Sequence, residues 1–118
     1  MTTRGLDIFD ATLQKTVPWV NELGEELGWE DKHQVLEGLR ATLHALRDRF
    51  TVEEAAHLEA QLPILLGGFY YENWRPAARP TKDRTKEEFL NHIRHYFSNI
   101  NADIDAESLV RAVFKIMA

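Results

Sequence analysis

At three places a histidine stands three residues after a glutamate or another histidine, a spacing that metal-binding helices use. The segments 30–33 and 54–57 both read Glu-x-x-His, the pair that di-iron helical bundles aim inward. His92 and His95 lie about one turn apart on a predicted helix and could share a zinc ion. Both Glu-x-x-His segments fall in predicted first helical turns, where glutamate is favourable in any case, and no third ligand stands at helical spacing from the two histidines. The sequence therefore predicts no metal site, and a metalloprotein using His92 and His95 remains the least favoured alternative.

His44, Arg47 and Asp48 share one flank of another predicted helix. His44 and Asp48 are four residues apart and could pair, which would raise the pKa of the imidazole. Catalysis would also require a nucleophile, and the serines, Ser98 and Ser108, do not lie in an elbow-like turn. The pattern favours a capping or interhelical hydrogen-bond network, and we expect no catalytic residue.

Aromatic rings and a cation are concentrated in residues 69–75, which we call the aromatic corner. Three consecutive rings span about 200° of a helix, so they cannot all face one core. Aromatic side chains beside an arginine are typical of binding hot spots, whereas core packing with bonded polar tips is the alternative. The predicted binding residues, at the corner and beside it, are Tyr70, Tyr71, Trp74, Arg75, Arg79, His44 and Arg47.

The stretch 75–86 is the one strongly basic part of the chain. It holds five basic residues and one acidic residue, a net charge of +4, whereas the whole chain carries −5 and its remainder −9. Arg75, Arg79 and Arg84 could together grip a phosphate or carboxylate. A solvated loop is the simpler interpretation. No cofactor is expected.

These side chains must be positioned by helices, and the first helix is predicted over Leu6 to Leu27. Its apolar or small residues recur at steps of three and four, which indicates one face of a helix. Pro18 lies off that stripe and should kink the helix near Thr16 without ending it, because the stripe continues beyond it. Gly28 suits the end of the helix. The stripe consists of Leu6, Phe9, Leu13, Thr16, Val20, Leu23 and Leu27.

The clearest helix is predicted from a cap at Asp31 to about Phe50. Burial of each apolar side chain on its stripe would contribute about 1.5–3 kcal/mol, so this face should anchor the core. The stripe consists of Leu36, Leu39, Leu43, Leu46 and Phe50.

Four further helices follow from caps and breakers. The segments 51–54 and 85–88 are capping boxes, Thr-x-x-Glu, each opening a helix. Pro63 suits the first turn of a helix that runs to about Glu72, and Asn73 can end it in the left-handed conformation. The last helix begins after Asp103 or Asp105. The expected inner positions of the final two helices are Phe89, Ile93, Phe97, Leu109, Val110, Val113, Phe114 and Met117.

The sequence therefore predicts an all-α fold of about six helices in one domain, residues 1–118. The fifth helix aligns with the first at an offset of 70, and the sixth with the second at 71, which suggests a repeated helix pair. The first unit would span about 5–74 with four helices. A loop at 75–85 and a second unit of two helices, 86–118, would follow. Because the second unit stops at Ala118, its last helix must be covered by the first unit or by another chain, and in the second case a homodimer through the C-terminal helices is predicted.

Composition excludes several classes of function. There is no cysteine, which excludes disulfides and thiolate sites, and no apolar run reaches the ~20 residues of a membrane span. Asp and Glu number 19 against 14 Lys and Arg, which argues against nucleic acid. The start shows no signal peptide, so we expect a cytoplasmic protein without membrane or nucleic-acid partners.

Four blocks of residues resemble a family of bacterial proteins known as domain-of-unknown-function family 2267. They are Trp19–Trp29, Leu39–Phe50, Glu53–Pro63 and Tyr70–Trp74, so the likeness covers most of the chain from about Trp19 onward. The resemblance implies an all-helical bacterial cytoplasmic protein and no established reaction, substrate or cofactor. Where the family usually has glycine, this chain has Asn73, and members often continue past the equivalent of Ala118.

Three functions follow as hypotheses. The preferred one is a non-catalytic helical interaction module that binds a protein partner or itself, through the aromatic corner or the final helix. The alternative is a small-molecule or anion site between the aromatic corner and the basic stretch. The metalloprotein is the third.

Overall fold

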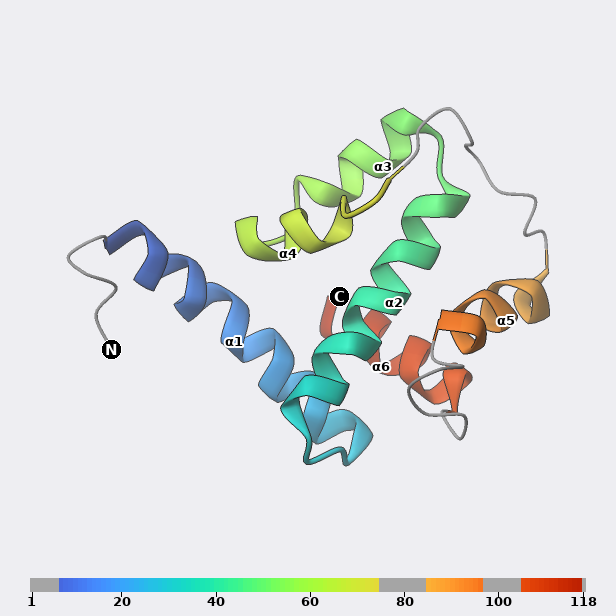
Figure 1. The fold of residues 1–118 in the computed structure, drawn as a ribbon, viewed down its shortest axis with the longest axis horizontal. Coiled ribbons are helices and arrows are strands. Elements are labelled where there is room, and N and C mark those ends of the chain that lie inside the picture. The colour runs from blue at the N-terminus through green and yellow to red at the C-terminus, as the bar shows by residue number, and fades with distance from the viewer. Residues whose placement is uncertain (1–6, 75–84, 97–104, 118) are drawn as a thin grey trace.

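The chain is helical through nearly all of the residues that the structure, a computed structural model, describes: 7–74, 85–96 and 105–117. In chain order the helices are α1 (Asp7–Leu27), α2 (Lys32–Arg49), α3 (Val52–Glu59), α4 (Ile64–Tyr70), α5 (Lys86–Tyr96) and α6 (Ala106–Met117). These described parts contain no strand. The predicted all-α fold is confirmed (Figure 1).

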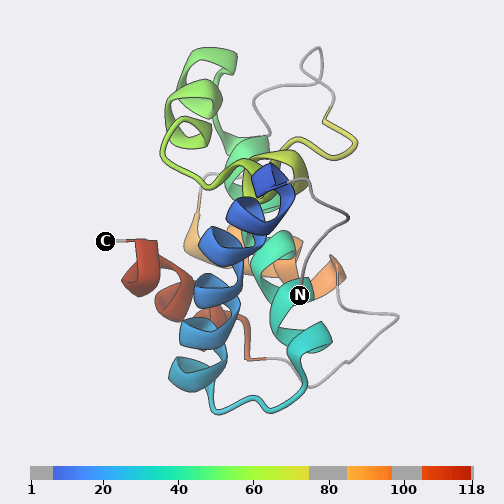
Figure 2. The ribbon, with the colours of Figure 1, turned by 90° about the vertical axis from the view of Figure 1, so that its left-hand side faces the viewer.

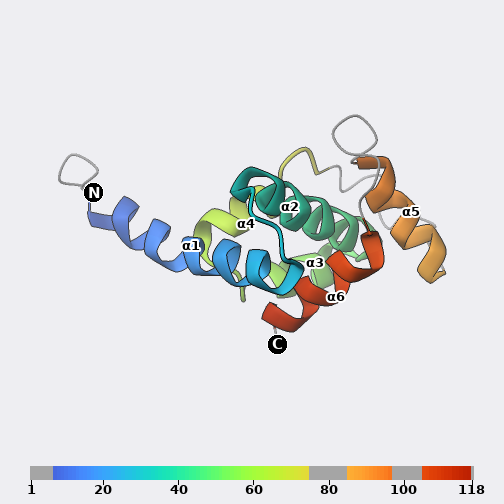
Figure 3. The ribbon, with the colours of Figure 1, turned by 90° about the horizontal axis from the view of Figure 1, so that it is seen from below.

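Helix α2 lies at the centre and contacts α1, α4, α5 and α6 (Figures 2 and 3). Leu39, Leu43 and Leu46 of its predicted stripe are buried as expected. Because helices pack on several sides of α2, burial extends beyond that stripe and includes Val35 and Thr42, both fully enclosed. The outer members of the stripe, Leu36 and Phe50, are only partly buried.

Helix starts follow the predicted caps. The Asp31 carboxylate accepts hydrogen bonds from the His33 and Gln34 N–H groups in the first turn of α2, and Thr51 and Glu54 form the complete capping box of α3. The Thr85 hydroxyl accepts from the Glu88 N–H before α5, and the Asp105 carboxylate accepts from the Ser108 N–H at the start of α6.

Helix ends also follow the sequence, with small shifts in position. Gly28 after α1 and Asn73 after α4 both take positive φ values, 71° and 56°, as expected of helix-ending residues. Pro63 is the N-cap of α4, one position before the first turn, and α4 ends at Tyr70 rather than near Glu72.

Helix α1 runs unbroken through Pro18, so the proline does not end it. Its apolar stripe is buried from Thr16 onward, where Thr16 is 5% exposed and Leu23 is fully buried. The first half projects beyond the other helices (Figures 1 and 3). There Phe9 is 54% exposed and Leu13 is 41% exposed, so the expectation that the whole stripe faces the core is wrong for this half.

Helix α6 is covered by the first unit, one of the two outcomes that the sequence left open. It packs against α1, α2 and α5, and buries Leu109, Val110 and Val113. Phe114 remains 47% exposed. The repeated helix pair itself stays a prediction, and Leu6, Phe97 and Asp103 lie outside the described residues.

Candidate functional site

The aromatic corner is built at the end of α4, where the chain turns back along α2. Tyr70 is fully buried, and its hydroxyl donates to the Ala55 carbonyl of α3 at 3.0 Å. The Tyr71 and Trp74 rings stack with centroids 5.1 Å apart. The Trp74 Nε1–H is buried and has no hydrogen-bond partner within the described residues. Most of the surface of these rings is therefore packed against other residues of the chain.

His44 and Arg47 bind the backbone carbonyls at the end of α4. The His44 Nε2–H donates to the Phe69 carbonyl at 2.6 Å, and the Arg47 guanidinium donates to the Tyr70 and Glu72 carbonyls. The last carbonyls of a helix have no partner within the helix. Side chains of α2 supply those partners here, which is the interhelical network that the sequence suggested.

The bonds of Asp48 differ from the predicted pair with His44. Its carboxylate accepts from Arg47 Nε at 2.8 Å and lies 3.8 Å from His92 Nε2 on α5. The Nε2 atom of His44 instead lies 3.7 Å from the carboxylate of Glu72. The carboxylate of Asp48, on α2, therefore lies beside a histidine of α5 instead of His44.

Sequence reasoning missed the ion pair between Arg40 and Glu72. Arg40 donates to both carboxylate oxygens of Glu72, at 2.8 and 3.0 Å, and also bonds Glu37 at 2.8 Å. Its guanidinium lies over the Phe69 ring, 5.2 Å from the centroid. Arg40 precedes His44 by four residues, so the helical spacing of one polar flank was the available signal.

Burial sets the charge of His44. The pKa of this imidazole is lowered from its usual value of 6.5, first because burial disfavours the charged form and also because Arg47 and Arg40 are cationic neighbours. The bond to Phe69 and the Glu72 carboxylate oppose that shift. The predicted rise in the pKa of His44 is therefore wrong in direction, and a neutral His44 donates to a carbonyl rather than acting on a nucleophile.

The candidate metal-binding residues that the structure describes do not converge, and Ser108 has a capping role. Ser108 donates to Asp105 at the start of α6, and Ser98 lies outside the described residues. Glu54 serves the α3 capping box, as expected of a first-turn glutamate. Within the described parts of the chain, no three His, Asp or Glu side chains gather where they could hold a metal ion.

Two of the predicted binding residues, Arg75 and Arg79, lie outside the described residues, as does Arg84. The described members of that set, Tyr70, Tyr71, Trp74, His44 and Arg47, lie together between α2 and the end of α4. The hydrogen bonds described above for this group are internal to the chain, and a binding role for it stays a prediction.

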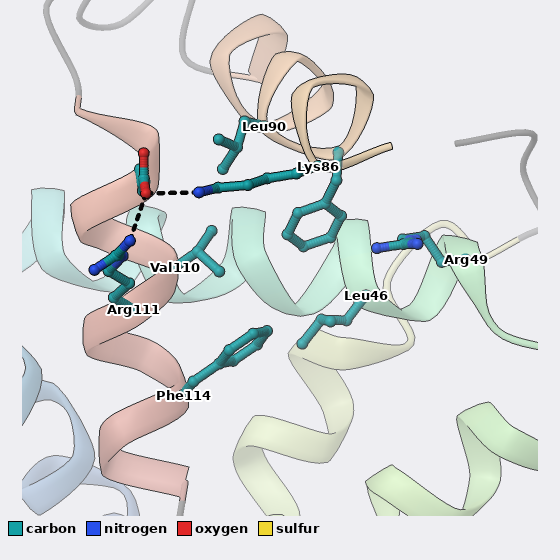
Figure 4. Close-up of a pocket in the computed structure, with 9 residues that line it drawn as sticks. Leu46, Arg49, Lys86, Leu90, Val110, Arg111 and Phe114 are labelled. Carbon is teal, nitrogen blue, oxygen red and sulfur yellow. Dashed lines mark hydrogen bonds and ion pairs between the residues drawn. The ribbon is translucent and has the colours of Figure 1, made fainter. Parts of the chain in front are cut away.

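A pocket that sequence reasoning missed lies between α2, α5 and α6 (Figure 4). Its volume is about 280 Å³. Apolar side chains from all three helices form its walls, and charged side chains stand at its rim (Figure 4). No local pattern could have revealed it, because its lining comes from three distant segments. The lining residues are Leu46, Arg49, Lys86, Phe89, Leu90, Glu107, Val110, Arg111 and Phe114.

The helices and the internally bonded corner define a small all-α protein. The family described as "Uncharacterized conserved protein (DUF2267)" matches residues 16–118, and the chain belongs to this family. The resemblance seen in the sequence is thus confirmed. The comparison with curated proteins gave no match. Along the helices that the structure describes, none has the length and apolar character needed to cross a membrane.

Proposed function

We propose that the chain is a non-catalytic helical interaction module that associates with a second copy of itself through the first half of α1. The observation that carries this proposal is a continuous apolar stripe that is buried at one end of the helix and uncovered at the other. Large exposed apolar patches on soluble proteins are typical of interaction surfaces.

The uncovered half presents large side chains at regular helical spacing. Phe9, Leu13 and Val17 are four residues apart and are each more than two-fifths exposed. Side chains at this spacing lie on one side of a helix. Ile8 is also large and 68% exposed, but it lies on another side of the helix, opposite Val17. We call Phe9, Leu13 and Val17 the α1 face.

A second apolar surface lies on another side of α1, beside the turn between α3 and α4. Ile64 is 72% exposed and lines a shallow groove together with Ile8, Leu62 and Pro63. Two separate elements therefore present apolar atoms to the same groove. This groove is separate from the side of α1 that carries Phe9, Leu13 and Val17.

Charge favours a second copy as the partner. The chain carries −5, so most of its surface would repel a copy. Residues 7–18 contain two acidic residues, Asp7 and Asp10, and one basic residue, Lys15, so this segment carries only −1. Two copies related by a two-fold axis can bring such segments together with little net repulsion, and two-fold dimers are the commonest soluble oligomers.

The other surfaces considered from the sequence are less suitable. The rings of the aromatic corner are buried or partly buried, and α6 is covered except around Phe114. The polar groups between α2 and α4 bond carbonyls of the same chain, which supports a non-catalytic role.

The test is the solution mass as a function of concentration. We expect light scattering and sedimentation velocity to show a monomer at low micromolar concentration and a dimer as the concentration rises. The double substitution Phe9→Ser and Leu13→Ser should abolish the dimer without unfolding the protein, because neither side chain lies in the core.

Two control variants locate the contact. Val52→Ser removes a comparably exposed apolar side chain from α3 and should leave the dimer intact. Phe114→Ser removes an exposed apolar side chain from α6 and tests the predicted interface through the C-terminal helices. A wild-type protein that stays monomeric into the millimolar range, or a dimer that only Phe114→Ser disrupts, would refute association through the α1 face.

A further inference from the structure

We infer that the pocket between α2, α5 and α6 binds a small amphipathic monocarboxylate, a molecule with one apolar chain or ring and one carboxylate. This inference uses none of the residues of the α1 face. It rests on the shape of the pocket, its apolar walls and the charges at its rim.

The walls match an apolar body of limited size. Leu46, Phe89, Leu90 and Val110 are buried side chains that still line the pocket, and Phe114 closes it from α6 (Figure 4). A volume of about 280 Å³ lies just below the usual range for small-molecule sites, which begins at about 300 Å³. It suits a chain of about eight carbon atoms or a single substituted ring.

The rim is cationic although the protein is acidic. It carries Arg49, Lys86 and Arg111 against one carboxylate, Glu107, a net charge of +2 on a chain of −5. A cationic rim in an acidic protein attracts anions to that place. The charge therefore favours an anionic ligand over a neutral or cationic one.

Two of these cations are already paired. Lys86 Nζ and Arg111 Nη2 each donate to Glu107 Oε1 at 2.7 Å, and together they hold the pKa of Glu107 below its usual value. The charge of Glu107 therefore offsets part of the charge of Lys86 and Arg111, and donors of both cations are already occupied at this end of the pocket.

Arg49 stands at the other end of the pocket (Figure 4). Its guanidinium lies over the Phe89 ring, 5.2 Å from the centroid, and it has no carboxylate partner among the described residues. Arginine binds carboxylates in a two-pronged geometry that lysine cannot reproduce. The geometry thus places the ligand carboxylate at Arg49 and the apolar body along Phe89 and Leu46 toward Phe114.

The competing occupant is a helix of a second copy, such as the acidic first turn of α1. A helix with its side chains is about 10–12 Å across, so only one or two of its side chains could enter a pocket of about 280 Å³. A small molecule fills the volume better, and the experiment separates the two cases.

The probe is octanoate, with 1-octanol as the uncharged control and acetate as the control for charge alone. We expect octanoate to raise the melting temperature in a saturable way and to give a measurable Kd by titration calorimetry, because a ligand of the folded state stabilises it. Acetate should have no effect, and 1-octanol should bind at least about tenfold more weakly. Equal binding of octanoate and octanol, or no binding of octanoate, would overturn the proposal.

Matched variants identify the site. Arg49→Gln should raise the Kd for octanoate about tenfold, whereas Arg94→Gln, which removes an exposed arginine of α5 outside the pocket, should leave it unchanged. Phe114→Ser should also weaken octanoate binding. If Arg49→Gln binds octanoate as the wild type does, or if Phe114→Ser lowers the solution mass while octanoate affinity stays the same, the pocket is not this site.

The two proposals fail independently. The Phe9→Ser and Leu13→Ser double variant should bind octanoate with wild-type affinity, since neither residue lines the pocket. A protein that binds octanoate but never dimerises would refute only the proposed function.

Discussion

At the scale of single residues, Arg47 is a buried arginine that holds the end of α4 by hydrogen bonds. Its side chain is 6% exposed and bonds two carbonyls and a carboxylate that belong to different parts of the chain. A charge this deeply enclosed is tolerated only when its donors are paired. The same bonds fix where the chain turns after α4.

Arg47→Ala should therefore destabilise the protein strongly. Loss of the guanidinium leaves the Tyr70 and Glu72 carbonyls without this donor, and we expect the free energy of unfolding to fall by about 3 kcal/mol. Urea denaturation followed by circular dichroism measures this. The matched variant Arg49→Ala, an exposed arginine on the same helix, should cost less than about 1 kcal/mol. Similar losses for the two would contradict the assignment.

His44 should make stability depend on pH. Since burial lowers its pKa in the folded state from the usual 6.5, the unfolded chain binds a proton at this site more readily than the folded protein does. The stabilising effect is complete above about pH 6.5 and is lost as the pH falls toward the lower folded pKa.

His44→Gln keeps a donor near the Phe69 carbonyl but cannot gain a charge in this range. We expect the urea midpoint of the wild type to drop between about pH 7.5 and pH 5.5 by more than that of the variant. If both proteins show the same pH dependence, the histidine is not protonated on unfolding.

At the scale of helices, Gly38 shows how closely α2 approaches its neighbours. A Cβ placed there would lie 2.9 Å from a methyl carbon of Leu109 on α6 and 3.2 Å from the Trp29 ring. Both contacts are shorter than ordinary van der Waals distances. The glycine therefore permits the close packing of α6 on α2.

Alanine at Gly38 and at Gly68 should have opposite effects. Gly38→Ala forces Leu109 or Trp29 to move, and we expect a loss of about 1–2 kcal/mol in the free energy of unfolding. A Cβ placed at Gly68, on α4, would meet no atom of a neighbouring element within 4 Å among the described residues, and this glycine does not have a positive φ. Gly68→Ala should gain about 0.5–1 kcal/mol from helix propensity. Guanidinium denaturation measures whether each substitution lowers or raises the free energy of unfolding. A rise at both positions would contradict the close contact at Gly38.

The elements that could be predicted are those fixed by neighbouring residues. The capping box at Thr51 and the buried positions Leu39 and Leu43 depend on spacings of three and four, which the sequence displays directly. Burial of Val35 and exposure of Leu13 were not predictable in this way. A stripe shows which face of a helix is apolar, but how far that face is covered depends on where other helices end.

The candidate sites could likewise be predicted only where their residues share one helix. Arg47 and His44 were identified because they share one helical flank. The carbonyls that accept their hydrogen bonds could not be predicted, because every residue has a backbone carbonyl and the sequence does not show which one lies nearby. The pocket beside Phe89 escaped prediction because it exists only after α2, α5 and α6 have met.

At the scale of the whole molecule, stability should be unevenly distributed. Helix α2 is enclosed by four other helices, whereas the first half of α1 has solvent where its apolar partners would be. Opening free energies are low where few apolar contacts are made. One end of the molecule is therefore expected to open far more often than the centre.

Hydrogen exchange followed by mass spectrometry tests this distribution. In dilute solution, amides in residues 8–17 should exchange faster than those in residues 39–46. At high concentration the first segment should gain protection, because association through the α1 face covers it. Slow exchange of residues 8–17 in dilute monomer would contradict both the uneven stability and the need for a partner.

The carbonyls that end α4 have a consequence for the order in which the protein forms. Since α2 supplies their donors, the seven residues of α4 cannot complete their own terminus. A helix of that length is marginal in water. We expect α2 to form first and serve as a template, with the α3–α4 hairpin acquiring its structure only after the folding barrier has been crossed.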